Sequence, residues 1–477
     1  MKKKLNFGSI IPLVGGNILG CTKSAGEDPS FHLSYSAFAN NEKHLAKHQP
    51  DVPFYYIDEQ EVPDLGEVDY VNTTCPCAGL SMLSTAVKGV DAPQNDWLYE
   101  SANYVLSQVK PKVMWGENAP GLFTGLGKEV AQKLIAIGKE HGYSFSMIKT
   151  NTQLHGIPQR RYRTFYFFWN TPTVPILNWK KRSHSTLLEY LAEIPKDATH
   201  QDWNIIEKSL TDYYLPYQFV LDKLGLTHPQ YAKEYAGTSI AKYIHDNNLV
   251  DECIEWLDAN HPGARKSDMK GKQTFEHSLR REQAKMADGK GFWDSSPRFY
   301  GEIFGPVIKR NMKSGGHPVE NRFLNVREAL HLMGMPHDFQ LEGQSALNHI
   351  AQNVPVNTAA DWADEVTKFI NGELKMSDKS FLKQDNCARK IIDDYSYEPQ
   401  PIYRVESVIT LDEAFMEREK AARKNIEELF ARPKPEYRVE SLIKPGKTFT
   451  ERLSITRKNI DERISESKKE YKVQSLI

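Results

Sequence analysis

The chain contains 477 residues, and 61 Lys and Arg stand against 62 Asp and Glu, which gives a net charge of −1. At about 100–200 residues per domain this length predicts two to four domains. The balanced charge excludes a simple polycationic nucleic-acid coat, although it leaves room for a local basic face. Five scattered cysteines are too few for a disulfide framework and indicate a reducing compartment.

The first twenty residues allow two interpretations. Three lysines and an apolar stretch that ends at Cys21 resemble a lipoprotein signal peptide. Gly15, Gly16 and Asn17 interrupt that stretch, and the same residues also predict a strand, a glycine-containing turn and the start of a helix, which is how a nucleotide-type site begins. Later segments supply the rest of such a site, so we prefer the second interpretation and expect a cytoplasmic protein without a membrane anchor.

From residue 5 to about residue 169, short β-rich runs alternate with amphipathic stretches at 97–109 and 128–141. This alternation predicts an α/β fold with a doubly wound, mostly parallel sheet. Functional residues are then expected at the carboxyl ends of the strands. The predicted strands cover residues 5–11, 31–38, 53–57, 68–74, 112–116, 143–149 and 163–169.

Changes in pattern divide the chain further. From about residue 173 to residue 318 the sequence is helical and irregular, β/α patterning returns at 322–372, and the remainder is strongly charged. We therefore expect four parts, which are residues 1–172, 173–320, 321–372 and 373–477.

The last part contains an internal repeat of 34 residues. The segment Tyr403–Ile409 recurs at Tyr437–Ile443 and at Tyr471–Ile477, and Phe381, Phe415 and Phe449 align in the same frame. So do the three segments that begin at Ala388, Ala422 and Thr456, each of which continues Arg-Lys. Two interpretations remain open, namely weakly structured units that bind one partner repeatedly, or a recently duplicated solvated linker.

Four clusters of residues can carry chemistry. Cys75-Pro-Cys77 directly follows a predicted strand, where a cysteine is well placed as a nucleophile if its thiolate is stabilised. By itself the block could equally be a buried structural pair or half of a metal site, but no second Cys pair or His-rich segment has zinc-like spacing, so we expect no metal site. Glu117-Asn118 also ends a predicted strand.

The third and fourth clusters lie on either side of the irregular segment. In the third, Arg161 and Arg163 alternate at the start of a strand and point to one face, where they can act together on an anionic or carbonyl-rich ligand. The fourth, residues 322–336, reads mainly as a packed helix.

Taken in order, these blocks resemble the cytosine carbon-5 methyltransferases. A Gly-Gly turn, an Asn-Glu after the second strand, Pro-Cys, Glu-Asn, Gln-x-Arg-x-Arg and Arg-x-Leu-x-x-Arg-Glu occur in the family's order and approximate spacing. The resemblance covers residues 5–170 and 320–370. It implies a doubly wound, Rossmann-like S-adenosylmethionine-dependent methyltransferase sheet, with an inserted target recognition domain at 173–320 and a repeat-containing C-terminal tail outside the family pattern.

The resemblance implies a role for each catalytic residue. Cys77 matches the nucleophile that adds to carbon 6 of a flipped cytosine, and Cys75 is a bystander. Glu117 matches the acid at the ring N3 and exocyclic amine. Asn118 is expected to brace the nucleophile loop, Arg163 to bind the cytosine carbonyl, and Arg161 to support Glu117 and the thiolate.

The resemblance also implies a site for the methyl donor. Gly15 and Gly16 match the turn against its amino-acid part, Glu42 its ribose ligand, Asp58 its adenine ligand, and Asn353 the closing block. Two blocks depart from the usual form. The family turn reads Phe-x-Gly-x-Gly-Gly, and this chain has Ile11 and Leu13 in place of the Phe and the first Gly. In the closing block, Ala351-Gln352 replace Gly-Asn.

The expected activity is therefore methylation of cytosine carbon 5 in double-stranded DNA by a protein that acts as a monomer. The alternatives are a transfer-RNA cytosine-5 methyltransferase of the same fold and a catalytically weak DNA-binding paralogue. Residues 261–320 carry 12 Lys and Arg against 7 Asp and Glu, hence +5, and are expected to contact phosphates. The repeats are candidates for binding a protein partner. The sequence does not indicate the target site, or whether the enzyme has a restriction partner.

Overall fold

The computed structural model describes most of the chain up to residue 392 and a short segment beyond it. The described residues are 5–81, 89–201, 211–261, 280–281, 283–285, 287–288, 298–307, 315–341, 346–383, 388–392 and 406–407. Residues 1–410 form one compact unit, and the second unit, 411–477, lies outside the described residues together with the second and third repeats.

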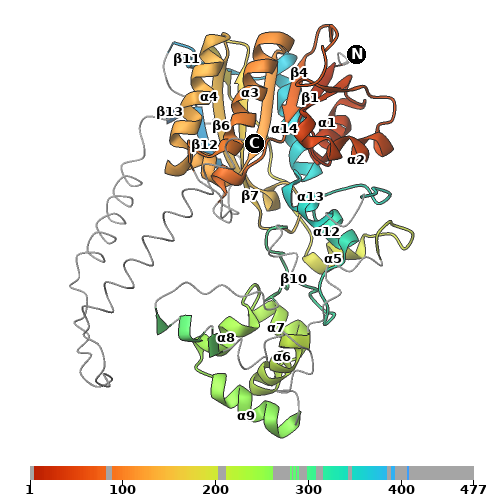
Figure 1. Ribbon diagram of the computed structural model, residues 1–477, viewed down its shortest axis with the longest axis vertical. Helices are drawn as coiled ribbons and strands as arrows, with labels where there is room; N and C mark the ends of the chain where they lie inside the picture. The colour runs from red at the N-terminus through yellow and green to blue at the C-terminus, as the bar shows by residue number, and fades with distance from the viewer. Residues whose placement is uncertain are drawn as a thin grey trace, which may run out of the picture. The chain divides into compact units, whose positions relative to one another are not determined.

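A single mixed sheet organises the first unit, with strand order β13-β12-β6-β7-β5-β4-β1-β2-β3 (Figure 1). All its neighbouring pairs are parallel except those that β7 and β13 make. All seven strands predicted from the sequence form, and the expected α/β sheet is confirmed. The strands are β1 (Phe7–Ile10), β2 (Phe31–Ser34), β3 (Phe54–Tyr56), β4 (Tyr70–Thr73), β5 (Val113–Asn118), β6 (Ser144–Asn151), β7 (Tyr162–Trp169), β12 (Ala388–Ile392) and β13 (Glu406–Ser407).

Helices cover both faces of this sheet, as its two-sided apolar strands require. Helices α3 (Asp96–Tyr104) and α4 (Lys128–Glu140) bury their apolar sides in a core with alternate residues of β1, β4, β5 and β7. Helices α1 (Gly16–Ala25) and α14 (Val356–Ile370) pack in a second core, which takes the other residues of the same strands. The sheet is therefore the middle of three layers. Helix α2 (Asn40–His48) connects β2 to β3.

The order of the strands fixes where a ligand can bind. The chain runs β1-β2-β3 outward in one direction and then returns to place β4 on the other side of β1. The loops after β1 and β4 consequently leave the sheet in opposite directions and open a crevice at its carboxyl edge, which is the switch point where doubly wound sheets bind ligands.

The segment between residues 173 and 320 divides into two packing regions. Its helix α5 (Leu187–Ala192) packs with residues 300–307 and with α12 (Val326–His331) and α13 (Ala346–Gln352) of the return segment. Four further helices share a separate hydrophobic core with Phe299, and we call them the helical lobe: α6 (Thr211–Leu224), α7 (His228–Glu234), α8 (Ile240–Asp246) and α9 (Val250–Asn260). Strands β9 (Arg298–Phe299) and β10 (Gly315–Gly316) pair beside it.

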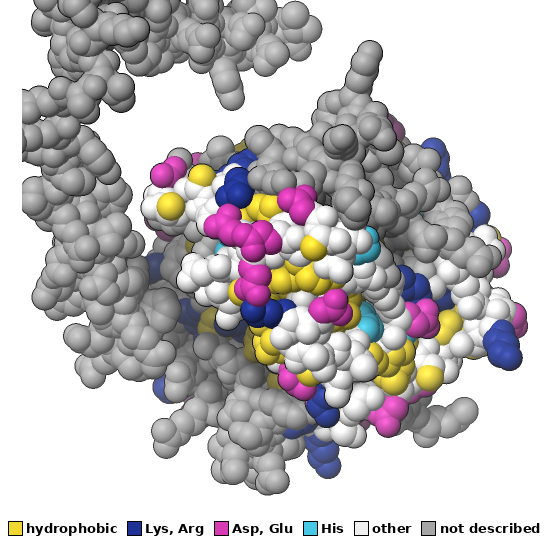
Figure 2. Space-filling model, turned by 90° about the horizontal axis from the view of Figure 1, so that it is seen from below, with side chains coloured by type: hydrophobic (Ala, Val, Ile, Leu, Met, Phe, Trp, Pro, Cys, Tyr) yellow, Lys and Arg dark blue, Asp and Glu magenta, His cyan; other side chains and the backbone are white. Residues whose placement is uncertain are grey.

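The described lobe is acidic, and the basic excess predicted from the sequence lies in residues 261–320, which follow its helices. Residues 211–261 contain three lysines and no arginine against eight Asp and Glu. The view from below in Figure 2 shows acidic side chains lying among hydrophobic ones there. Most of the basic residues of 261–320 lie outside the described residues, so their expected contact with phosphates stays a prediction.

The sheet extends past residue 372, where the sequence places the end of the catalytic part. Strand β11 (Met376–Ser380) pairs with β8 (Thr173–Pro175), and Phe381 is buried in the same core as α14. Strand β12 then adds to the main sheet in parallel with β6. The first repeat therefore contributes to the fold, which its highly charged composition does not indicate.

Candidate active site

The predicted site residues gather at one edge of the sheet. Cys77 and Glu117 follow or end β4 and β5, which are parallel neighbours. Arg161 and Arg163 lie at the start of β7 and not at its end, but β7 runs antiparallel to β5. Its first residues therefore lie beside the last residues of β5, and all four side chains meet.

Cys77 occupies the turn that begins a short 3₁₀ helix, Ala78–Leu80. Burial raises the pKa of its thiol above the ordinary value, Glu117 raises it further, and Arg163 and Arg161 lower it. Cys75 is buried more deeply, and its Sγ lies 3.2 Å from Thr73 Oγ1. Of the two cysteines in this loop, Cys77 is the one with cationic neighbours and partial exposure.

Glu117 and Arg163 form a buried ion pair. Arg163 Nε lies 2.7 Å from Glu117 Oε1, and the two side chains are 14% and 3% exposed. Burial raises the pKa of the Glu117 carboxyl, while Arg163 and Arg161 lower it. A carboxyl whose neutral form is favoured by burial can donate a hydrogen bond to a ring nitrogen, which suits the role expected of Glu117.

Asn118 is fully buried beside this pair. Its Oδ1 accepts a hydrogen bond of 2.8 Å from the Ala119 N–H, and its Nδ2 has no hydrogen-bond partner among the described residues. The side chain thus holds the turn after β5, and its expected contact with the nucleophile loop is not among the hydrogen bonds found.

Arg161 makes its hydrogen bonds to the backbone. Its guanidinium donates to the carbonyls of Val307, Ala351 and Asn353, which belong to the segments after the helical lobe and before α14. Burial and the like charge of Arg163 lower the pKa of Arg161 to about 9, whereas Glu117 and Cys77 act in the opposite direction. Arg161 therefore both braces distant parts of the chain and acts electrostatically on Glu117 and Cys77.

Gln159 performs a similar bridging task that the sequence does not reveal. Its amide donates to the carbonyl of Leu332 and accepts from the N–H of Val307. Arg160 N–H donates to the Phe304 carbonyl. The Gln-x-Arg-x-Arg block thus holds residues 304–307, where the chain returns from the helical lobe to the sheet domain.

The turn after β1 keeps the backbone of a glycine-rich loop without all of its glycines. Gly15 has φ 89°, and Ile11 and Leu13 also take left-handed values of 50° and 51°. Such values are uncommon for ordinary side chains and rare for a β-branched one. The two substitutions noted in the sequence therefore leave left-handed backbone at positions where side chains disfavour it.

Gly16 and Asn353 contact each other. The Gly16 N–H donates to Asn353 Oδ1 at 2.9 Å, and a Cβ on Gly16 would come within 2.3 Å of the Val354 carbonyl oxygen. Gly16 is therefore required by the approach of the closing block. The buried Asn353 side chain thus fixes the first residue of α1 through this hydrogen bond.

Glu42 lies on α2 and Asp58 lies two residues after the end of β3, and each is held by one neighbour. Tyr56 donates a hydrogen bond of 2.7 Å to Glu42 Oε2, and Ser36 donates both its N–H and its hydroxyl to Asp58. Slight burial raises the pKa of Asp58, but the hydrogen bonds from Ser36 prevail and lower it. The sequence does not predict Ser36 and Tyr56 as partners of these carboxylates, because neither residue occurs at a distinctive spacing.

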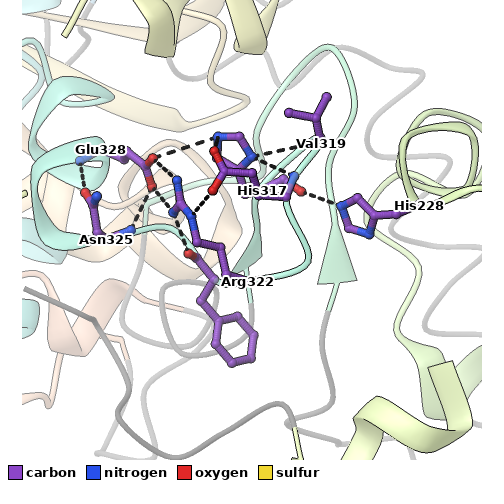
Figure 3. Close-up of polar contacts among 8 residues, drawn as sticks. His228, His317, Val319, Arg322, Asn325 and Glu328 are labelled. Atoms are coloured by element: carbon purple, nitrogen blue, oxygen red, sulfur yellow. Dashed lines mark hydrogen bonds and ion pairs between the residues drawn. The ribbon is translucent and has the colours of Figure 1, made fainter. Parts of the chain in front are cut away.

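The fourth cluster organises the return segment (Figure 3). Asn325 and Glu328 form a reciprocal capping box at the start of α12, and Arg322 donates two hydrogen bonds to the Glu328 carboxylate. His228 of the helical lobe donates from Nε2 to the His317 carbonyl at 3.0 Å. The prediction of a packed helix is confirmed, and this network also joins the lobe to it.

These features define a class of protein: a doubly wound α/β enzyme that brings a cysteine, a buried carboxyl and two guanidinium groups together at the ligand-binding edge of its sheet. Comparisons with known proteins identify the family. Residues 34–368 match the family model of the C-5 cytosine-specific DNA methylases, and the chain belongs to this family. It is accordingly an S-adenosylmethionine-dependent DNA cytosine-5 methyltransferase, which confirms the resemblance found in the sequence.

Among similar proteins, the type II methyltransferase M.Bpa9945I of Bacillus paralicheniformis is 22% identical over 336 residues, or 64% of this chain and 71% of that protein. The type II methyltransferase M1.BsuMI of Bacillus subtilis is 31% identical over 134 residues, 27% of this chain and 30% of its own. Among solved structures, a putative DNA modification methyltransferase encoded within an Escherichia coli prophage aligns with a TM-score of 0.48 and 14% identity, over 77% of this chain and 99% of that one.

Two further observations concern the described residues alone. They contain no group of three or more His, Cys, Asp and Glu side chains arranged to hold a metal ion. None of their helices is long and apolar enough to cross a membrane.

Proposed function

We propose that the enzyme methylates cytosine through a covalent adduct between Cys77 and carbon 6 of a base flipped out of duplex DNA. The observation that carries this proposal is the buried Glu117–Arg163 pair within electrostatic range of Cys77. Carbon 5 of cytosine is a poor nucleophile, and addition of a thiolate to carbon 6 makes it an enamine carbon. Once carbon 5 carries the methyl group, loss of the carbon-5 proton to a base and elimination of the Cys77 thiolate from carbon 6 restore the aromatic ring and free the enzyme. Flipping costs a few kcal/mol, since the base must leave its stack.

The carboxyl and guanidinium groups would divide the recognition of the ring. Glu117 is charged in its ion pair with Arg163 and takes up a proton when the base is bound; it then donates to N3 and accepts from the exocyclic amine, which stabilises the charge that develops when the thiolate adds. Arg163 reaches the ring carbonyl once it shares its hydrogen bonds between the base and Glu117. Arg161 contributes positive potential from behind, and Asn118 keeps the turn that carries Glu117 in place.

S-adenosylmethionine supplies the methyl group, and the crevice beside β1 offers groups that suit it. Ser34 Oγ at the end of β2 is buried and has no hydrogen-bond partner among the described residues, which leaves it available to a ligand. Glu42 is proposed as the acceptor for the ribose hydroxyls and Asp58 for the adenine amine. Gly15 leaves the turn open to the amino-acid part, while Asn353 and Gly16 fix the wall behind it.

Residues 173–320 are proposed as the target recognition domain, with the helical lobe as its body. This assignment is supported by the separate core of the lobe and by the contacts that Val174, near the start of the segment, and Val307, beyond the lobe, make with the sheet domain. The similarity to type II methyltransferases supports a role as the modification enzyme of a restriction-modification pair. A protein that protects DNA on its own would carry the same site.

Transfer of tritiated methyl groups from S-adenosylmethionine tests the proposal. Wild-type protein should label unmethylated duplex DNA, and Cys77→Ser should abolish the labelling because a hydroxyl is not ionised at neutral pH. The matched control is Cys75→Ser in the same loop, which should retain activity. Duplex DNA that contains 5-fluorocytosine should form a covalent complex with wild type and Cys75→Ser but not with Cys77→Ser.

Two outcomes would contradict the proposal. An active protein that forms no adduct with 5-fluorocytosine DNA would refute the addition step. Labelling of transfer RNA but not of DNA would assign the substrate to RNA. When DNA is labelled, bisulfite sequencing of DNA methylated in a host that lacks methylation of its own identifies the target sequence.

A further inference from the structure

The first tail repeat supplies a strand that reaches the level of the active site. Strand β12 lies beside β6 (Figure 1), and Arg389 stands opposite Met147 of that strand. The same row continues through Tyr166 of β7 and Gly116 of β5, the residue before Glu117. Paired residues direct their side chains to one face of a sheet, so Arg389 is on the face that α3 and α4 cover.

On that face Arg389 contacts Phe123 in two ways. Its guanidinium carbon lies 4.0 Å from the centre of the Phe123 ring, and its Nη2 donates a hydrogen bond to the Phe123 carbonyl. Phe123 is buried in the same core as α4. A planar guanidinium can stack on a ring and donate from its edge at the same time, whereas an ammonium is a point charge without a plane. The arginine therefore holds both the ring and the backbone of Phe123.

This phenylalanine ends a short 3₁₀ helix, Pro120–Phe123, that packs against the nucleophile loop. The contact is made with the 3₁₀ helix Ala78–Leu80, which directly follows Cys77. It is closest at Gly121, where an added Cβ would stand 2.0 Å from the Leu80 carbonyl oxygen. Leu80 in turn donates its N–H to the Cys77 carbonyl at 3.0 Å. The position of one 3₁₀ helix therefore constrains the other, and with it the backbone of the nucleophile.

We propose that Arg389 is a positioning residue for the reaction, which holds the helix of Phe123 against the nucleophile loop and so fixes the approach of Cys77 to the target carbon. The inference rests on the nucleophilic role proposed for Cys77, and it gives the first repeat a task although the repeat lies outside the family match. A displacement of about 1 Å at a reacting centre can cost about a hundredfold in rate. The loop keeps other contacts, such as the hydrogen bond from the Gly89 N–H to the Gly79 carbonyl, so loss of Arg389 alone should cost less.

Kinetics of the full-length chain test this role. Arg389→Ala should lower both kcat and the rate of adduct formation with 5-fluorocytosine DNA about tenfold, and leave the KM for S-adenosylmethionine within about twofold of wild type. Arg389→Lys keeps the charge without the plane, and its rates should fall only about threefold. The matched control is Lys379→Ala, which removes an exposed cation from β11 and should equal wild type in each assay.

A double variant tests whether the effect passes through Phe123. Phe123→Leu removes the ring and keeps an apolar side chain in the core. Because both substitutions disrupt the same contact, Arg389→Ala combined with Phe123→Leu should be slower than the slower single variant by less than about twofold. Losses that multiply would show that Arg389 acts by another route, and would overturn the proposal.

The amount and the rate of the adduct separate positioning from loss of fold. The final amount counts folded sites, whereas the rate per site reports the geometry of the loop. We expect Arg389→Ala to reach the wild-type amount more slowly. A smaller amount formed at the wild-type rate, or a rate within about twofold of wild type, would overturn the proposal. Failure of the wild-type protein to form any adduct would instead refute the addition step at Cys77, and this inference with it.

Discussion

At the scale of single residues, the reactivity of Cys77 reports the electrostatics of the site. Burial raises the pKa of the thiol, Arg163 lowers it and Glu117 raises it. Only the thiolate is nucleophilic, so alkylation by iodoacetamide should rise with pH up to a value above the ordinary thiol pKa. At pH 8, Arg163→Gln should slow the modification of Cys77 about tenfold and Glu117→Gln should accelerate it by a similar factor.

The opposite signs of these two variants make the experiment specific. Peptide mass spectrometry separates Cys77 from Cys21, Cys75 and Cys253, which are buried and serve as internal standards. If both variants changed the rate in the same direction, the effect would come from altered packing around the loop, and the assignment of charge to this site would be wrong.

The sequence predicts which residues form the site better than it predicts their contacts. Cys77, Glu117, Arg161 and Arg163 come together as expected, because strand ends of neighbouring strands share an edge. The backbone contacts of Arg161, and the hydrogen bond of Asn353 to Gly16, depend on partners 190 and 337 positions away. Spacing along the chain carries no information on such pairs.

At the scale of elements, the helix that follows α3 ends in an unfavourable conformation. Lys110 is exposed and has φ 52°, and its N–H donates to the Val105 carbonyl. A side chain costs about 1–2 kcal/mol in this left-handed region, and glycine avoids most of that cost. We expect Lys110→Gly to stabilise the fold by about 1 kcal/mol in urea unfolding, after allowance for the greater freedom of glycine in the unfolded chain.

Lys110→Ala is the control for that prediction. It removes the same charge and side chain but keeps a Cβ, and it should leave the free energy of unfolding unchanged within about 0.5 kcal/mol. Equal stabilisation by both variants would show that the lysine charge, and not the backbone conformation, is responsible.

The start of α12 offers a second prediction at this scale. Glu328 accepts two hydrogen bonds from Arg322 and one from the Asn325 N–H, and it is 6% exposed. Glu328→Gln keeps the shape but removes the charge, so it should destabilise by about 2 kcal/mol, the usual range for hydrogen bonds to charged groups. Asn325→Asp retains the cap and should cost less than half as much. A Glu328→Gln variant as stable as wild type would show that the network is not fully formed in solution.

The elements themselves are largely predictable. The seven strands from β1 to β7 and helices α3 and α4 form where apolar periodicity places them, since both faces of these strands are buried between helix layers, apart from the half-buried edge strand β3. Strand β12 is not predictable in the same way. Its sequence is Ala-Arg-Lys-Ile-Ile, and it is held between β6 and the two-residue strand β13 by the backbone ladder and by one arginine that stacks on Phe123.

At the scale of the whole molecule, charge is distributed less simply than a basic DNA-binding lobe would require. The described helices of the lobe are acidic, and the basic excess of 261–320 follows them in the sequence. Contacts to phosphates are sequence-independent and screened by salt.

The division into two compact units indicates where the chain can be truncated without loss of stability or activity. Truncation after Thr410 removes the second unit, which clusters separately from residues 1–410, and should preserve both the thermal midpoint and methyl transfer to naked DNA. Truncation after Gly372, the boundary that the sequence suggests, removes β11, β12 and the 2%-exposed Phe381. Full burial of a phenylalanine contributes about 2–3 kcal/mol, and the truncation also bares the β6 edge, so this variant should melt several degrees lower and aggregate.

Differential scanning fluorimetry with light scattering distinguishes the two truncations. Equal stability of both truncations would mean that the first repeat does not dock, and loss of activity after truncation at 410 alone would make the second unit part of the enzyme.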